Sequence, residues 1–292
     1  IKHHYLGFAL FPTLIFVSAV IFFFTLGRRA PNVPRLIFPL FVFLSPFPII
    51  ICNLFPYKIQ NLEILNKLFI HNHPYEPFIK SDTTKLIVGT LPPPRFSTGK
   101  LLEKDVDFCY GSYYNSLWLF IDKIHSLGLR YDNSKEAIEE RKAFLVKSKI
   151  GVCDIVESAE REKMDASDLG MKHIKLRNVI GYLEQYPNIN TLLFTGGNSK
   201  NGPEYFFRKH LKNYGLKLEV LSNEVPRIHQ FTLCHTERSR SVSRTIKTVS
   251  LTSGSGAANI SISKLPLYKK FKAANPKFNT FDFRVTQYRE FF

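Results

Sequence analysis

The chain has 292 residues, enough for one large domain or two smaller ones. Its 40 lysine and arginine residues outnumber 24 aspartate and glutamate residues, and the net charge of +16 favours an anionic partner such as nucleic acid or an acidic membrane surface. The four cysteines lie far apart without a C-x-x-C pair, which argues against a disulfide framework, a zinc site or an iron–sulfur cluster and for reduced thiols in a cytosolic protein.

The first 61 residues differ in kind from the rest. Residues 5–26 form a charge-free apolar run of membrane-spanning length, and a second apolar run, 36–55, is interrupted by prolines. Three interpretations compete: a membrane anchor, an uncleaved signal-like segment, and translated upstream sequence that is no part of the folded protein. We favour the third interpretation slightly over the anchor, and the protein lies at a membrane only if the apolar segment is genuinely part of it. Residues 62–292 keep 35 basic against 24 acidic side chains, so they are basic in their own right.

From about Leu62 the sequence is typical of a globular domain. Short apolar, β-branched runs predict strands over residues 85–89, 150–156, 191–195, 217–221 and 245–251. Apolar residues at helical spacing, with capping or proline start signals, predict helices over residues 113–127, 134–147, 176–186, 203–211 and 265–274. Strands that alternate with helices imply an α/β fold with a mostly parallel sheet of four to five strands, covered on both faces.

Two further segments are expected to lie at the surface. His71 and His73 occur in a turn-rich lead-in, and without a third ligand nearby we interpret them as surface or capping residues rather than metal ligands. The Arg/Ser-rich stretch 234–243 has no apolar periodicity, so we interpret it as a surface loop insertion. A basic loop that binds RNA or DNA is the alternative for this stretch.

Unusual loops follow four of the predicted strands, at residues 89–96, 154–168, 195–198 and 251–259. Because the carboxyl ends of parallel strands share one edge of a sheet, these loops are expected to converge on a ligand-binding crevice. None is a P-loop or a dinucleotide fingerprint, and the chain has no G-x-S-x-G elbow of a serine hydrolase. The motifs in these loops therefore indicate neither nucleotide binding of these two kinds nor serine-hydrolase catalysis.

A set of motifs in these loops resembles the uracil-DNA glycosylase superfamily, and most closely its hypoxanthine-DNA and mismatch-specific branches. In chain order the motifs are Gly89-Thr-Leu-Pro-Pro, Tyr110-Gly-Ser-Tyr-Tyr-Asn-Ser-Leu-Trp118, Cys153-Asp-Ile-Val with Glu160-Arg-Glu and Asp165-Ala-Ser, Leu193-Phe-Thr-Gly-Gly197, and Leu251-Thr-Ser-Gly-Ser-Gly-Ala-Ala-Asn259. The resemblance covers about residues 62–292 and implies a three-layer α/β/α sandwich. It also implies a monomeric enzyme of base excision repair, without metal or cofactor, that flips uracil or hypoxanthine out of DNA and hydrolyses its N-glycosidic bond.

The resemblance assigns the catalytic role to a small group of residues. In many family members the third residue of the Gly89-type loop activates water, but here that residue is Leu91, which cannot do so. Asn115 matches the asparagine that takes over in the hypoxanthine branch, and its alternative role is a helix N-terminal cap. Asp154 and Asp165 are further candidates for positioning water, with structural ion pairing to Arg161 as the alternative.

The same resemblance implies contacts to the flipped base. Phe108 or Tyr110 would stack on the base, although either could equally serve core packing. Thr195 occupies the position of a base-reading asparagine, so Asn198 would have to reach back if an amide is needed. The expected substrate-binding residues are Gly89, Thr90, Leu91, Pro92, Phe108, Tyr110, Thr195 and Asn198.

DNA phosphates are expected to bind at the last loop, through Ser253, Ser255 and Asn259. This loop lacks the histidine and the bulky wedge residue of the family. The missing histidine and Leu91 leave open a catalytically inactive relative that binds nucleic acid. The first 55 residues alone leave open a membrane-anchored protein of unrelated function. The primary expectation is a cytoplasmic, nucleoid-associated glycosylase.

Overall fold

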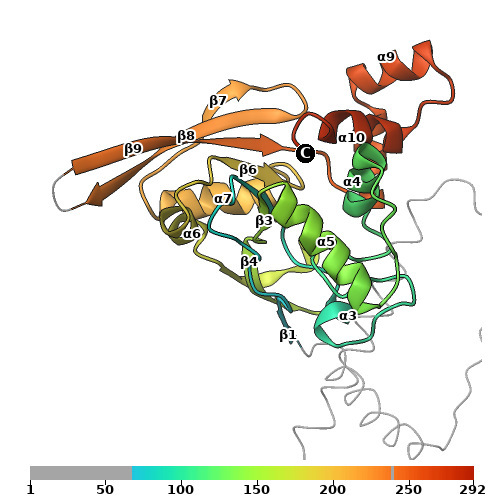
Figure 1. Cartoon of the computed structure of the whole chain (residues 1–292), viewed down its shortest axis with the longest axis horizontal. Coiled ribbons are helices and arrows are strands. Elements are labelled where there is room, and N and C mark those ends of the chain that lie inside the picture. Colours follow the sequence, from blue (N-terminus) through green and yellow to red (C-terminus); the bar gives the residue numbers. More distant parts are fainter. Residues whose placement is uncertain (1–67, 238–239) are drawn as a thin grey trace, which may run out of the picture. The chain divides into compact units, whose positions relative to one another are not determined.

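A computed structural model describes residues 68–237 and 240–292 (Figure 1). The chain divides into two compact units, residues 1–57 and 58–292, and the fold below is that of the second unit. The apolar N-terminal segment, and with it the membrane-anchor interpretation, lies outside the described residues. Within residues 68–237 and 240–292, no helix has both the length and the apolar character needed to cross a membrane.

The fold is mixed α/β and contains two sheets. The larger sheet has the strand order β3 (Ile150–Val152), β2 (Lys85–Val88), β6 (Thr191–Phe194), β9 (Arg240–Ser250), β8 (Arg227–Glu237) and β7 (Glu219–Ser222). Its first four strands pair in parallel, whereas β8 runs antiparallel to both of its neighbours. The expectation of four to five strands is therefore wrong, because β8 had no predicted counterpart. The smaller sheet is antiparallel and consists of β1 (Phe69–Asn72), β4 (Val156–Arg161) and β5 (Lys172–Leu176).

Helices pack on both faces of the larger sheet, since its strands send alternate side chains into two separate cores. Leu192 and Phe194 belong to one core, with α6 (Val179–Gln185) and α7 (Pro203–Lys212). Leu193 between them belongs to the other core. The helices of that second core are α4 (Leu117–His125), α5 (Lys135–Lys147) and α10 (Thr280–Tyr288). Within residues 68–237 and 240–292 the other α-helices are α3 (Pro94–Ser97), α8 (Asn259–Ser263) and α9 (Pro266–Ala274).

Several predicted elements differ from the observed ones at their ends. The N-cap of α5 is confirmed, because the Ser134 hydroxyl accepts a hydrogen bond from the Ala137 amide at 3.2 Å. The helix predicted from residue 113 begins only at Leu117, since Asp105 accepts the Tyr113 amide and holds residues 112–115 in a turn. The strand predicted over residues 150–156 ends at Val152, and the chain enters the smaller sheet at Val156.

The Arg/Ser-rich stretch 234–243 is not a loop insertion, and that prediction is wrong. It lies in the long hairpin of β8 and β9, which pair in continuous register from Arg227 with Ser250 to Glu237 with Arg240 (Figure 1). Apolar side chains at the base of this hairpin are buried in the core, whereas its outer part is held by ladder hydrogen bonds that need no apolar pattern. A search for apolar periodicity therefore misses the strands.

Candidate active site

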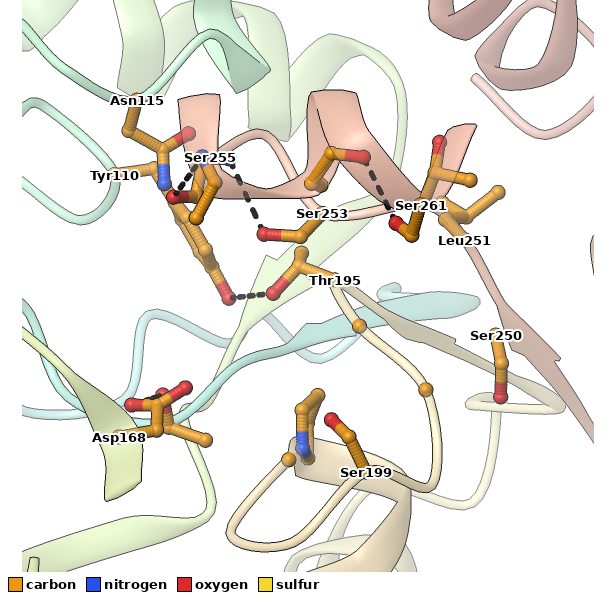
Figure 2. Close-up of a pocket in the computed structure, with 18 of the residues that line it drawn as sticks. Tyr110, Asn115, Asp168, Thr195, Ser199, Ser250, Leu251, Ser253, Ser255 and Ser261 are labelled. Carbon is orange, nitrogen blue, oxygen red and sulfur yellow. Dashed lines mark hydrogen bonds between the residues drawn. The ribbon is translucent and has the colours of Figure 1, made fainter. Parts of the chain in front are cut away.

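The loops that follow β2, β6 and β9 surround one pocket of about 910 Å³ (Figure 2). The loops thus meet at the carboxyl edge of the parallel strands, as predicted, and enclose a cavity there. Nine of the residues expected from the sequence line it: Thr90, Leu91, Pro92, Tyr110, Asn115, Asp154, Thr195, Ser253 and Ser255.

The other five expected residues lie outside the lining. Gly89 sits directly behind it and donates its amide N–H to Asp154. Phe108 is buried in the aromatic core beside Trp118, in agreement with its packing alternative. Asn198 is absent from the lining, and the Asn259 side chain is engaged with Thr280 and Arg284. These positions offer little contact to a ligand in the pocket.

Asp165 is also outside the pocket. Its side chain is 52% exposed, and its carboxylate lies 3.7 Å from the Arg161 guanidinium. It also accepts the Ser167 amide at 3.1 Å. This geometry fits the structural ion-pair alternative, while Asp168, three residues later, does line the pocket.

Asn115 joins the two loops that face each other across the pocket mouth. Its Oδ1 accepts the amide of Leu117, the first residue of α4, at 2.9 Å from the position before the N-cap Ser116. Its backbone forms a β-bridge with Ser255. Gly254 makes this approach feasible, because a Cβ there would lie 2.5 Å from Asn115 Oδ1. Asn115 therefore binds a backbone amide at the start of α4 without being its N-cap, and it lines the pocket with its amide NH₂ left for a ligand or water.

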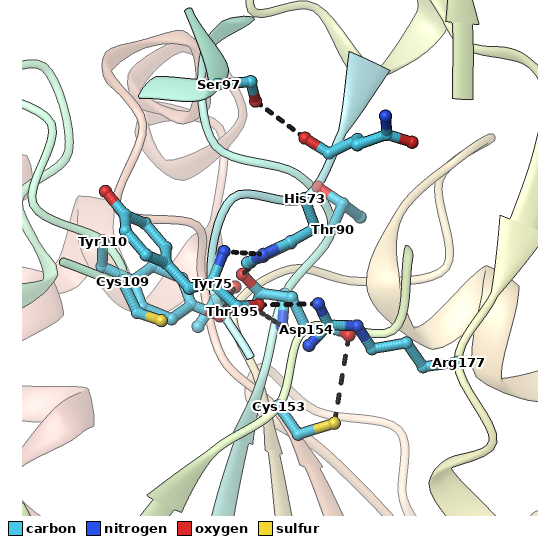
Figure 3. Close-up of polar contacts among 12 residues, drawn as sticks. His73, Tyr75, Thr90, Ser97, Cys109, Tyr110, Cys153, Asp154, Arg177 and Thr195 are labelled. Atoms are coloured by element: carbon cyan, nitrogen blue, oxygen red, sulfur yellow. Dashed lines mark hydrogen bonds and ion pairs between the residues drawn. The ribbon is translucent and has the colours of Figure 1, made fainter. Parts of the chain in front are cut away.

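Asp154 is the centre of a hydrogen-bond network behind the pocket wall (Figure 3). Its Oδ1 accepts the Gly89 amide at 2.7 Å and the Tyr110 hydroxyl at 2.6 Å. Its Oδ2 lies 2.9 Å from His73 Nε2, and His73 Nδ1 accepts the Tyr75 amide, so a neutral His73 must carry its hydrogen on Nε2 and donate it. With three donors Asp154 is well suited to orient Tyr110 and has little capacity left to hold a water.

The prediction that His71 and His73 are surface or capping residues is wrong about the surface, because the His73 side chain is 1% exposed and His71, in β1, is equally buried beside β4. His73 does accept a local backbone amide, that of Tyr75. Arg161 Nε donates to His71 Nδ1 at 2.9 Å. Burial, together with the nearby Arg161 charge, lowers the pKa of His71 to about 4, which keeps this ring neutral.

Tyr110 forms a rigid wall of the pocket. Its φ of 60° lies in the left-handed region, which a bulky residue adopts only when its surroundings compensate the strain. Burial raises the pKa of the Tyr110 hydroxyl well above the ordinary value, and the negative charge of Asp154 raises it further. The neutral hydroxyl donates to Asp154 and lies 3.4 Å from the Thr195 hydroxyl. The ring thus has one fixed orientation toward a ligand.

We expect Asp154→Ala to lower the free energy of unfolding by at least about 3 kcal/mol, since it leaves the Gly89 amide, the Tyr110 hydroxyl and His73 without their acceptor. Urea denaturation measures this loss. Asp165→Ala is the matched control, because it removes a half-exposed carboxylate and is expected to cost about 1 kcal/mol or less. Equal stability of the two variants would contradict the network.

Asp168 is a second carboxyl group in the pocket lining. Its Oδ1 accepts the Thr90 hydroxyl at 2.9 Å. Burial raises the pKa of Asp168 to about 6, against the opposing effects of the Thr90 hydrogen bond and the Arg161 charge. The group therefore exchanges its proton close to neutral pH.

This raised pKa predicts a pH dependence of stability. Since the folded-state pKa of about 6 exceeds the ordinary value of 3.8, the folded protein binds the proton more tightly, and stability is gained as the pH falls through 6. Relative to Asp168→Asn, the parent should gain about 1 kcal/mol of unfolding free energy between pH 7 and pH 5. Urea denaturation at both pH values tests this, and an Asp168→Asn variant with the parent's pH profile would refute it.

A buried carboxylate fixes the far end of the pocket. Glu204, at the start of α7, is fully buried and accepts hydrogen bonds from the Ser250 hydroxyl at 2.6 Å, Arg208 at 2.9 Å and Arg227 at 2.7 Å. Ser250 and Arg227 both line the pocket. These hydrogen bonds connect the end of β9, the start of β8 and the start of α7.

Among the polar residues that sequence reasoning missed, Asp168, Arg227 and Ser250 line the pocket and His73 supports it through Asp154. Asp168 is the last residue of the charged loop 154–168, which the sequence places at the site. A carboxylate at that position could have been named as a candidate. No sequence signal links His73 to Asp154, which lies 81 residues away. No protein-family model matches the chain, and neither the curated proteins nor the solved structures give a significant match. The function is therefore argued from the site itself.

Proposed function

We propose that this chain is a DNA glycosylase that hydrolyses the N-glycosidic bond of a deaminated base, uracil or hypoxanthine, in DNA. The observation that carries the proposal is the meeting of Asn115 with the Ser253–Ser255 loop at the mouth of a pocket of about 910 Å³. This is the arrangement expected if the two motifs act together on one flipped nucleotide. The four parallel strands between two helical cores also suit the three-layer α/β/α sandwich of the resembling family.

The chemistry needs a pocket, because a base inside a duplex is inaccessible and must be extruded before its bond to the sugar can be cleaved. Bond cleavage places positive charge on the sugar and negative charge on the departing base. A polar group must hold water against the sugar, and the base must be fixed in orientation. Asn115 is the amide at the pocket mouth for the first task, and the rigid Tyr110 ring serves the second.

DNA is the partner that the surface favours. Residues 62–292 carry 35 basic against 24 acidic side chains. Tyr113 and Tyr114 next to Asn115 are 54% and 67% exposed, and Ile260, directly after Asn259, is 70% exposed. Such exposed aromatic and apolar side chains can stack on bases or fill the space of an extruded one. Ile260 thus supplies a bulky residue that the preceding loop lacks.

A catalytically inactive, DNA-binding relative is the second candidate. Leu91 lines the pocket at the position where the family carries its water-activating side chain, and it has no polar group. The choice between the two candidates depends on whether Asn115 suffices. The membrane-anchored alternative rests on residues outside the described part of the chain.

The test is base release by the full chain from labelled oligonucleotides that contain one uracil or one hypoxanthine. Single strands and duplexes with each opposing base are treated with alkali after incubation, which cleaves the backbone at abasic sites. Cleavage at the deaminated position alone supports the glycosylase. Salt-dependent binding without cleavage supports the inactive relative, and the absence of both overturns the proposal.

A further inference from the structure

Among the described residues that line the pocket, two carry carboxyl groups, and they differ in their free hydrogen-bonding capacity. Asp154 accepts three hydrogen bonds, from Gly89, Tyr110 and His73. Asp168 accepts one side-chain hydrogen bond, from Thr90 to its Oδ1. Its Oδ2 accepts none from the residues that the structure describes. Of the two carboxyl groups, Asp168 is therefore the one whose second oxygen is free to accept a hydrogen bond from a ligand.

The surroundings of Asp168 leave this acceptor available to a ligand. Figure 2 shows Asp168 on the opposite side of the pocket from Asn115. The Arg161 guanidinium lies nearby, but it donates to His71 and to the carbonyl oxygens of Asp165 and Ser167. The positive charge of Arg161 therefore favours the ionised form of Asp168, but Arg161 donates no hydrogen bond to it. A partly buried carboxylate with an unused oxygen is stabilised by a donor from the ligand.

The strand end that the family resemblance assigns to base reading offers no amide here. Thr195 occupies that place, and its hydroxyl lies 3.4 Å from the Tyr110 hydroxyl. Asn198 is not among the lining residues. A flipped base must be recognised from elsewhere in the pocket.

We propose that Asp168 recognises the ring N–H of the flipped base and so distinguishes a deaminated base from its parent. This inference rests on the proposed function. Deamination turns the ring nitrogen N3 of cytosine, an acceptor, into the N3–H donor of uracil, and turns N1 of adenine into the N1–H donor of hypoxanthine. A carboxylate accepts from such an N–H and repels the lone pair of the parent base. Asp168 thus selects bases with a ring N–H and rejects cytosine and adenine.

The decisive variant is Asp168→Asn in the full chain. If the amide keeps its oxygen on Thr90, it presents an NH₂ group to the pocket, which reverses the preference from N–H donors to ring acceptors. We expect kcat/KM on uracil and hypoxanthine to fall at least 10-fold, and the binding of free uracil and hypoxanthine, followed by ligand-observed NMR, to weaken to the same extent. Binding of free cytosine and adenine should strengthen. Asp165→Asn removes a charge beside the same Arg161 outside the pocket and should leave all of these unchanged.

A second measurement uses the parent protein alone and so does not depend on whether the Asp168→Asn variant folds. The parent should bind 3-methyluracil and 1-methylhypoxanthine, which lack the ring N–H, at least 10-fold more weakly than the unmethylated bases. Equal binding of methylated and unmethylated bases, or equal losses in the Asp168 and Asp165 variants, overturns the inference. If no base is released while free-base binding depends on Asp168, the proposed function fails and the recognition stands. If free bases do not bind, the recognition fails, whatever the outcome of the release assay.

Discussion

Asn115→Ala is expected to lower the rate of base release at least about 100-fold, the usual effect of removing a group that positions a reactant at the reacting bond. Asn115 lines the pocket and bridges to Ser255, and it is the residue to which the resemblance assigns the catalytic role. The variant also loses the hydrogen bond to the Leu117 amide, which should cost about 1 kcal/mol of stability. Single-turnover base release at saturating enzyme measures the effect on chemistry apart from binding.

The matched control for this variant is Asn178→Ala. Asn178 is the N-cap of α6, where its Oδ1 accepts the Gly181 amide at 2.9 Å and the Tyr214 hydroxyl at 2.6 Å, and it is not among the residues that line the pocket. The Asn178→Ala variant should lose at least as much stability as Asn115→Ala and retain the parent's rate of base release. Equal rates for Asn115→Ala and the parent would move the catalytic role away from Asn115. Equal losses in both variants would show that the effect comes from stability alone.

Gly89→Ala is expected to destabilise the fold by about 3 kcal/mol. A Cβ at this position would lie 2.3 Å from the Tyr110 hydroxyl, 2.8 Å from Asp154 Oδ1 and 2.9 Å from the Thr195 hydroxyl. All three distances are too short for carbon–oxygen contact, and the Tyr110 side chain has little freedom because its backbone and hydroxyl are both fixed. The methyl group must therefore break the network that shapes the pocket wall.

Urea denaturation of Gly89→Ala and of Gly256→Ala tests this expectation. A Cβ at Gly256 meets nothing within 4 Å, so that variant should keep the parent's stability within about 0.5 kcal/mol. Adding Tyr110→Phe to Gly89→Ala removes the oxygen closest to the new methyl group and should restore part of the loss. A Gly89→Ala protein as stable as the Gly256→Ala protein would contradict the packing described here.

The location of the site could be predicted from the sequence, because it depends on strand order alone. Short apolar strands followed by the loops at residues 89–96, 195–198 and 251–259 place those loops at one sheet edge, and residues of all three line the pocket. The partners within the site could not be predicted. Asp154 meets His73 and Tyr110 through contacts that span 81 and 44 residues, and no local pattern encodes such pairs.

Two of the elements that were not predicted, β8 and α10, differ in the signal that their sequences carry. β8 is long and amphipathic only near its base, so its outer half depends on backbone pairing with β9. The helix α10, in contrast, carried a usable signal. Asn279 and Asp282 form a capping box at its start, a pattern that marks a helix N-terminus in sequence. This helix matters to the site, since Gln287 and Tyr288 hold Thr252 at the pocket edge.

The central claim is the release of an intact base, and detection of that base by mass spectrometry tests it most directly. The full chain is incubated with duplexes that contain hypoxanthine or uracil, and the filtrate is analysed for free base while the DNA is examined for an unbroken backbone. The glycosylase predicts free base in amounts equal to the abasic sites formed, and its absence with Asn115→Ala. A filtrate without free base, from a folded parent that binds the duplex, would contradict the claim.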